Sequence, residues 1–176
     1  WKISSDGLTY TFKLREDAVW SDGTPVTAQQ FVDSWLRFLN PETAAEYAYM
    51  MNMVIEGAAE YNSGEAGPEA VQIRALDERT FQFDLTGPAP YVLGMLAHYA
   101  FSVVPTHVID EYGGDWTEPE NFVGNGPFVL KEWSPQEKLT VVPNETYWNR
   151  KAVQLDQVTY LPIEDNNTAY KMYTSA

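Results

Sequence analysis

The sequence predicts a mixed α/β fold of the α+β class. Short stretches alternate apolar and polar residues with a period of two, which is typical of strands with one buried face. Other stretches repeat apolar residues at intervals of three and four, which is typical of helices packed on a core. Hydrophobic residues make up 44% of the 176 residues and aromatic residues 14%, so the chain can bury a core and is not disordered by composition.

The first predicted strand is "LTYTFKL", residues 8–14, whose apolar side chains fall on one face. The stretch that follows it, "WSDGTPVT", residues 20–27, raises the question of whether it binds a ligand or only redirects the chain. It contains an Asp-Gly turn signal, Pro25 ends strand pairing, and Thr27 with Gln30 has the spacing of a capping box. We therefore interpret this stretch as a turn followed by a helix cap.

Three helices are predicted next. The first covers about 27–39 and carries a wide apolar stripe. Asn40 is a good N-cap and Pro41 suits the first helical position, so a second helix is expected to start there and to carry Tyr47, Met50, Met51 and Val54. A third, short helix is expected around 57–61, before the polar loop "NSGEAG".

The middle of the chain is predicted to hold a β-hairpin and two helices. The stretches "VQIRAL", 71–76, and "TFQFDL", 80–85, have strand character and are joined by three polar residues. The stretch "GPAPYVLGMLA" starts a helix after its prolines. A further short helix is expected between Thr106, its cap, and Gly113, its stop.

A loop-like stretch, residues 115–128, marks a change of character and is the candidate domain boundary. Beyond it, "FVLKEW", "KLTVVP" and "QVTYLPI" are predicted strands, and Asp165 or Asn166 caps a last helix. Tyr170 and Tyr173 on that helix would face a core that this chain does not visibly supply, so we expect the chain to be truncated at both ends.

The composition excludes several classes of function. The formal net charge is −14, which argues against a nucleic-acid partner because a phosphate backbone needs clustered Lys and Arg. The absence of cysteine excludes disulfide frameworks, zinc ribbons and thiol catalysis. The uncharged run 85–109 is interrupted by Pro88, Pro90 and Pro105, and the apolar part between these prolines is too short to span a bilayer. A targeting segment is not visible and is expected upstream or removed.

No catalytic or metal-binding motif is apparent. We expect His98 to be a core or rim residue and His107 to be exposed, and nothing around Ser102 suggests an activated nucleophile. Paired carboxylates could serve a glycosidase, and that alternative stays open. The unusual feature is a set of aromatic residues dense enough for a sugar or peptide cleft, although most are expected in the core: Tyr47, Tyr49, Trp116, Trp133, Tyr147 and Trp148.

Several blocks resemble a known family in the same order and at compatible spacing. The segment "DGLTYTFKLREDAVWSDGTPVTAQQFVDSW", followed by "GNGPFVLKEW", "PNETYWN" and "LDQVTYLPIEDNNTAYKMY", resembles the large solute-binding proteins that serve peptide ABC importers. The form "YLPI" after "YWN" is closer to the oligopeptide-binding members than to the dipeptide or nickel ones. The resemblance covers nearly the whole chain.

The resemblance implies a periplasmic or cell-surface receptor that closes two lobes around an extended peptide and delivers it to an importer permease, without catalysis, cofactor or metal. Residues 1–123 would be the smaller accessory domain and 124–176 the start of a return segment into the first lobe. In oligopeptide-binding members a tyrosine after the "NP" restart faces the ligand, and the matching residue is Tyr47. The alternative that Tyr47 only packs against its own helix and core, without a ligand contact, stays open.

Three alternatives remain. An enzyme would show two facing acids in a pocket, one with a raised pKa. A binder of nickel, haem, sugar or dipeptide on the same fold would differ in its cleft, and a metal cargo would want His or Cys ligands, of which the chain has two histidines and no cysteine. A peptide-signal receptor on the same fold cannot be distinguished from a nutrient importer by sequence.

Overall fold

The fold is described from a computed structural model, which describes residues 1–175. The chain divides into two compact units. Unit 1 comprises Trp1–Ala18 and Pro25–His107, and unit 2 comprises Val19–Thr24 and the chain from Val108 onwards. Both units mix strands and helices, so the predicted α+β class is confirmed. The predicted domains, 1–123 and 124–176, have other bounds than these units and stay a prediction about the longer protein.

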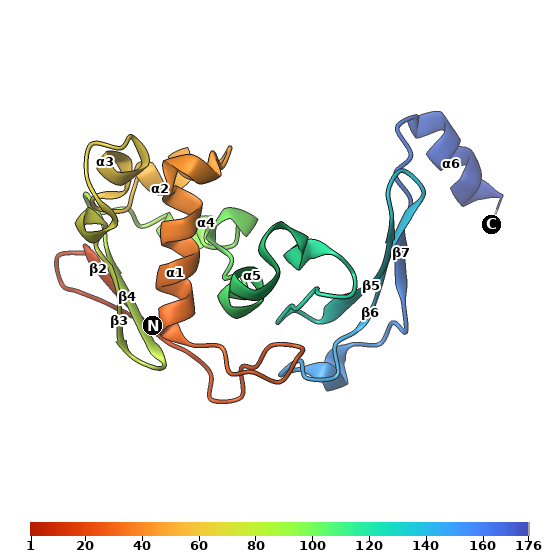
Figure 1. Ribbon diagram of the computed structural model, residues 1–176, viewed down its shortest axis with the longest axis horizontal. Coiled ribbons are helices and arrows are strands. Elements are labelled where there is room, and N and C mark those ends of the chain that lie inside the picture. Colours follow the sequence, from red (N-terminus) through yellow and green to blue (C-terminus); the bar gives the residue numbers. More distant parts are fainter. Residues whose placement is uncertain (176) are drawn as a thin grey trace. The chain divides into compact units, whose positions relative to one another are not determined.

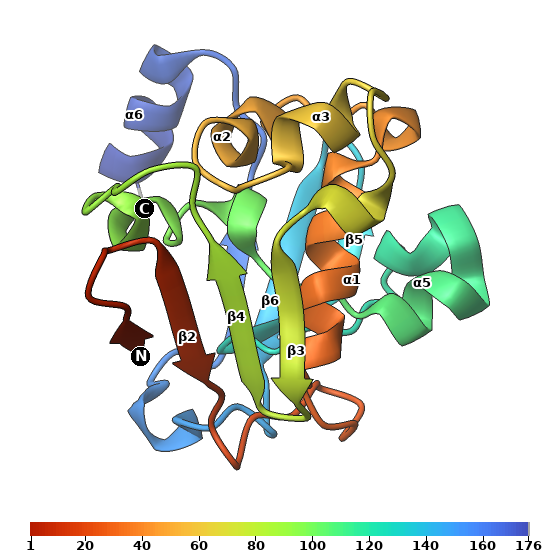
Figure 2. The same ribbon diagram turned by 90° about the vertical axis from the view of Figure 1, so that its left-hand side faces the viewer.

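Unit 1 is built on a four-stranded antiparallel sheet with the order β1-β2-β4-β3 (Figures 1 and 2). The register of the central strand pair, β2 and β4, places aromatic side chains opposite each other. Tyr10 of β2 faces Phe83 of β4, and their ring centroids lie 5.5 Å apart in a stacked arrangement. The predicted first strand and the hairpin are confirmed. The strands are β1 Lys2–Ile3, β2 Thr9–Lys13, β3 Ile73–Asp77 and β4 Thr80–Asp84.

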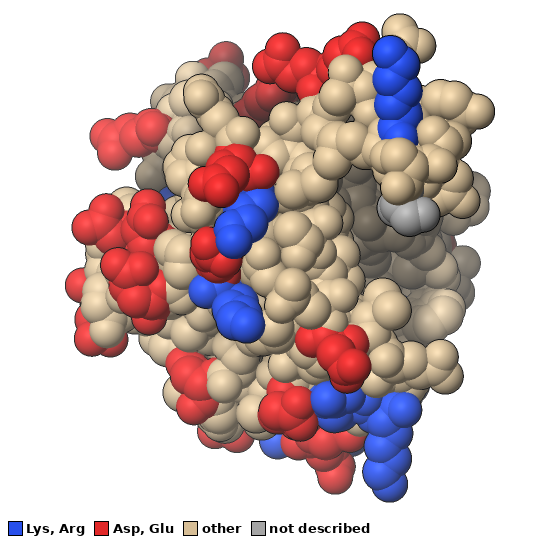
Figure 3. Space-filling model, turned by 90° about the vertical axis from the view of Figure 1, so that its right-hand side faces the viewer, with Lys and Arg blue, Asp and Glu red and all other residues tan. Residues whose placement is uncertain are grey.

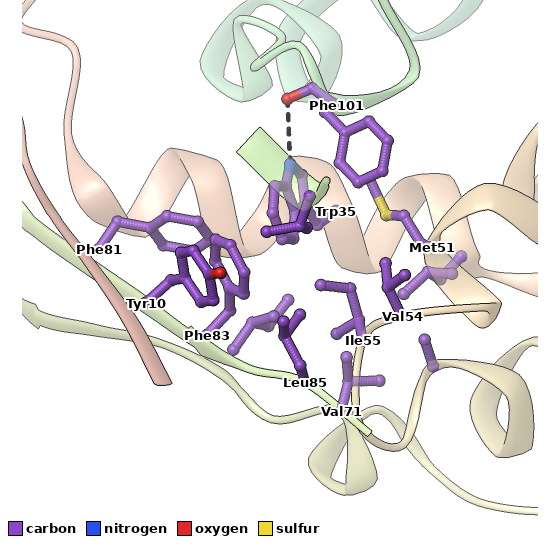
Figure 4. Close-up of a cluster of buried hydrophobic side chains, with 14 of the residues drawn as sticks. Tyr10, Trp35, Met51, Val54, Ile55, Val71, Phe81, Phe83, Leu85 and Phe101 are labelled. Atoms are coloured by element: carbon purple, nitrogen blue, oxygen red, sulfur yellow. Dashed lines mark hydrogen bonds between the residues drawn. The ribbon is translucent and has the colours of Figure 1, made fainter. Parts of the chain in front are cut away.

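Helix α1, Ala28–Leu39, packs on this sheet and begins with the predicted capping box. The Thr27 side chain accepts from the Gln30 amide, and the Thr27 amide donates to the Gln30 side chain. The apolar stripe of α1 faces the strands, and Trp35 lies in the centre of the core (Figure 4). Its indole Nε1–H donates to the carbonyl of Phe101 at 3.1 Å, which satisfies the polar end of a buried ring.

The prediction of one continuous second helix after Asn40 was wrong. Asn40 does cap, with its side chain accepting from the Glu42 amide, and Pro41 does occupy a first position, but they start only the 3-10 helix η1, Pro41–Thr43. Ala44 then adopts a left-handed conformation with φ 49°, which ends the turn. A separate helix, α2, runs over Ala48–Asn52 with Tyr47 at its N-cap.

The remaining helices of the first two-thirds of the chain are short. Three of them match the helices predicted around 57–61, in "GPAPYVLGMLA" and between Thr106 and Gly113 within a few residues, whereas the three further 3-10 helices were not predicted. Their bounds are α3 Ala58–Asn62, η2 Pro68–Ala70, α4 Val92–Met95, η3 Tyr99–Phe101, α5 Thr106–Tyr112 and η4 Gly113–Thr117.

Unit 2 contains a three-stranded antiparallel sheet with the order β5-β6-β7. Its strands are the three that the sequence predicted. Its elements are β5 Phe128–Ser134, β6 Lys138–Pro143, η5 Arg150–Ala152, β7 Val158–Tyr160 and α6 Asn166–Thr174. Asp165 caps α6 by accepting from the Thr168 amide at 2.8 Å. No residue of α6 is buried within the described chain, and Tyr173 is 83% exposed.

The stretch "WSDGTPVT" is a structural turn, as predicted. Gly23 adopts φ 89°, a conformation that favours glycine, and the Trp20 amide donates to the Thr24 carbonyl at 2.8 Å. Trp20 is almost fully buried. The Ser21 amide donates to the Gly124 carbonyl, and the Thr146 hydroxyl donates to the Trp20 carbonyl. The backbone groups of Trp20 and Ser21 therefore stabilise unit 2, whereas Thr27 caps α1 in unit 1.

Candidate functional site

The candidate site is a group of four rings in unit 1, which we call the aromatic cluster: Tyr47, Tyr49, His98 and Tyr99. The Tyr47 ring is at its centre, with centroid distances of 5.1 Å to His98, 5.5 Å to Tyr99 and 6.0 Å to Tyr49. Residues about fifty positions apart in the chain thus meet through Tyr47, the residue that the family resemblance singles out.

Local structure fixes both sides of the cluster. Tyr47 is held at the start of α2 by the tight turn that Asn40 and Ala44 produce. His98 caps η3, and its Nδ1 accepts from the Ala100 amide at 3.2 Å. The imidazole also stacks on Tyr99, at 4.3 Å between centroids and 30° between planes. The three rings of Tyr47, His98 and Tyr99 are therefore set by backbone turns on two separate segments.

One part of the cluster is open to solvent. Tyr47 and His98 are half-buried, whereas Tyr99 is 66% exposed and Tyr49 is 53% exposed. The cluster thus presents two ring faces and hydroxyl groups on a supported base. Such a surface can stack against a side chain or exchange hydrogen bonds with a peptide.

The electrostatic surroundings of the cluster are negative. The pKa of the Tyr99 hydroxyl is raised above its ordinary value, first by desolvation and then by a hydrogen bond with Tyr47 and the charges of Tyr47, Glu46 and Tyr49. Across the whole chain, acidic residues outnumber basic ones by 25 to 11; on the face shown in Figure 3, acidic and basic side chains are interspersed. A negatively charged ligand group would therefore find no favourable partner in the cluster itself.

The structure corrects two expectations about candidate residues. His98 lies at the rim and is hydrogen-bonded, as predicted, but His107, expected to be exposed, is half-buried. Most of the unusual aromatic residues were expected in the core, yet none of the six is buried in the described chain. Trp133 is 45% exposed and Trp148 is 47% exposed. Sequence reasoning also missed Tyr99, which only the tertiary fold brings to Tyr47.

A second candidate is an apolar hollow of about 170 Å³ between α1 and the sheet of unit 1. Its lining offers no free hydrogen-bonding group for a peptide backbone, because the one polar side-chain atom, Trp35 Nε1, already donates to Phe101. The lining residues are Phe12, Leu14, Phe31, Trp35, Phe81, Phe83, Leu96 and Phe101. The hollow is therefore an opening in the core rather than a site with directional chemistry.

Residues 1–175 contain neither a candidate metal site nor a helix that could span a membrane. No group of three or more His, Asp or Glu side chains in that range is arranged to hold a metal ion. Over the same residues, every helix is too short or too polar to cross a membrane.

The chain is similar to solute-binding proteins along almost its full length. A family model described as "Bacterial extracellular solute-binding proteins, family 5 Middle" matches residues 1–175. The periplasmic oligopeptide-binding protein OppA of Escherichia coli strain K12 is 41% identical over 98% of this chain. The chain spans only about a third of the length of the curated relatives it matches, 32% in the case of that protein.

Solved structures agree with the sequence relatives. A periplasmic oligopeptide-binding protein of an oligopeptide ABC transporter from Borrelia burgdorferi superposes with a TM-score of 0.94 and 44% identity, over 99% of this chain and 35% of that one. The Haemophilus influenzae OppA complex with the peptide RPPGFSPFR superposes with a TM-score of 0.95 and 36% identity, over 99% of this chain and 34% of that one.

Proposed function

This chain belongs to family 5 of the bacterial extracellular solute-binding proteins, and on that premise we propose that the full-length protein binds extended oligopeptides for an ABC importer. The observation that carries the proposal is the match of nearly the whole chain to proteins named for oligopeptide binding, at 41% and 44% identity. The protein acts outside the cytoplasm, and its partners are the peptide and the permease subunits of the importer.

The proposed mechanism is binding rather than catalysis. Extended peptides are held through their backbone and charged ends, while pockets tolerate different side chains. Closure of a second lobe then buries the ligand and creates the surface that a transporter recognises. The absence of a nucleophile motif in the sequence favours this reading over a hydrolase, and turnover of peptides or glycosides that disappears on mutation of one carboxylate would contradict it.

Tyr47 is proposed as the peptide contact of this chain. Its ring is half-buried and braced by His98 and Tyr99, so a ligand that stacks on it meets a surface that is already ordered. Pre-ordered aromatic residues commonly contribute most to binding, because little conformational entropy is lost on contact. Ordinary packing of the ring within unit 1 is the alternative that the experiment has to separate.

Calorimetry of the full-length protein tests this function. The peptide RPPGFSPFR, which occupies the Haemophilus influenzae relative, should give saturable heat, and Ni²⁺, haem and a disaccharide should not. Tyr47→Ala should weaken peptide binding by about tenfold, the size expected for losing one well-packed contact. Tyr91→Ala, which removes another exposed tyrosine of unit 1 outside the cluster, should leave affinity unchanged. Saturable binding of a non-peptide ligand alone would contradict the proposal.

A further inference from the structure

The two segments that build the aromatic cluster carry no positive charge. Residues 38–73 contain no Lys or Arg, and residues 85–107 contain no charged side chain of either sign. Glu46 directly precedes Tyr47, and its charge acts on Tyr99. Unit 1 as a whole has thirteen acidic and six basic residues, a formal net charge of −7. The two segments that build the cluster therefore carry charge of one sign only.

The rings themselves favour a cation. The face of a tyrosine ring carries the negative part of its quadrupole, so a positive group positioned over it is attracted. Tyr99 and Tyr49 are more than half exposed, and Tyr47 contacts both of them. An incoming positive group would thus meet two aromatic faces beside a carboxylate, with no competing Lys or Arg on the same segments.

Resting on the proposed peptide-binding function, we propose that the aromatic cluster and Glu46 form a subsite for an arginine side chain of the bound peptide. Arginine fits better than lysine because its guanidinium is planar, stacks on aromatic rings and is more weakly hydrated than an ammonium group. The side chain would stack on Tyr99 and place its charge near Glu46. The proposal thus predicts a preference for basic peptides and assigns it to a defined set of residues.

The test compares arginine with citrulline, an uncharged side chain of nearly the same shape. Five alanine-based pentapeptides each carry one arginine, at a different position in each peptide. Five matched pentapeptides carry citrulline at the same positions. Affinities for the full-length protein are measured by calorimetry. At one position, arginine should bind about 3- to 30-fold more tightly than citrulline, the range expected for an exposed cation–π contact together with an exposed ion pair.

Four variants locate that preference. Glu46→Gln and Tyr99→Leu should each reduce the arginine-to-citrulline ratio by about two- to fivefold. Tyr99→Phe keeps the ring face and should keep most of the ratio. Glu65→Gln removes the same charge from an exposed residue of unit 1 outside the cluster and should leave the ratio unchanged.

The outcomes separate the subsite from the function on which it rests. If the peptides bind without any arginine preference, the proposed subsite is wrong but the proposed function stands. The same holds if the preference survives both Glu46→Gln and Tyr99→Leu. A stronger preference for an apolar side chain at the same position would also overturn it. If no pentapeptide binds, and RPPGFSPFR does not bind either, the proposed function fails and this inference fails with it.

Discussion

Replacement of Trp35 by phenylalanine should destabilise unit 1 by about 2–4 kcal/mol. Trp35 is 2% exposed and its Nε1–H donates to the Phe101 carbonyl at 3.1 Å in a buried setting. Removing the donor leaves that carbonyl unsatisfied, which costs about 1–3 kcal/mol. The smaller ring also leaves a void against Phe81 and Phe83, whose ring centroids lie 5.0 and 5.3 Å from Trp35, and this adds roughly 1 kcal/mol.

The free energy of unfolding is measured by urea titration of the chain, followed by far-UV circular dichroism because the substitution alters tryptophan fluorescence. Trp1→Phe is the matched control, since Trp1 belongs to the same unit and is 72% exposed. It should change stability by no more than about 0.5 kcal/mol. Equal effects of the two substitutions, or a loss below about 0.5 kcal/mol for Trp35→Phe, would refute the reasoning that the indole is a buried and hydrogen-bonded centre of the core.

Three further predictions concern the cap, an ion pair and the isolated chain. Thr27→Ala should cost about 0.5–2 kcal/mol through loss of the cap without changing peptide affinity of the full-length protein; a large affinity loss at unchanged melting temperature would count against this. Desolvation opposes ionisation of Asp84, but hydrogen bonds with Arg74, 2.7 Å away, and with Thr9 lower the pKa of Asp84 overall. The ionised Asp84 therefore stabilises the fold above the ordinary pKa of an aspartate. This stabilisation is lost as the pH falls through the lower pKa of the folded state. Asp84→Asn should therefore reduce the acid sensitivity of unfolding below about pH 4, and an unchanged pH profile would contradict this. The isolated chain should fold but give no saturable heat with oligopeptides at micromolar concentration, since burial of the ligand needs a second lobe; submicromolar binding would show that the whole site lies within these residues.

Local signals in the sequence predicted the elements whose structure depends on neighbours in the chain. The alternation in residues 8–14 and the Thr27 capping box need only nearby residues, and both are confirmed. The helix after Asn40 was predicted too long because nothing in the sequence marks Ala44 as a left-handed residue. Alanine rarely adopts that conformation, so residue propensity gives no sign of the break at this exposed position.

The candidate site was less predictable than the fold. The family resemblance pointed to Tyr47, but its neighbours His98 and Tyr99 come from a segment about fifty residues away. A pairing of that kind depends on how α2 and η3 pack on the core, and periodicity carries no information about it. The absence of Lys and Arg from residues 38–73 is visible in the sequence, whereas the position of that segment beside two exposed tyrosine rings is not.

Native mass spectrometry of the full-length protein, purified without refolding, tests the central claim most directly. Peptide-binding proteins that close around their ligand retain it during purification, because burial slows dissociation. We predict bound species with a distribution of peptide masses, which are released on unfolding and sequence as short oligopeptides. A single non-peptide mass, such as a haem, a metal ion or a sugar, recovered in stoichiometric amount would contradict the claim.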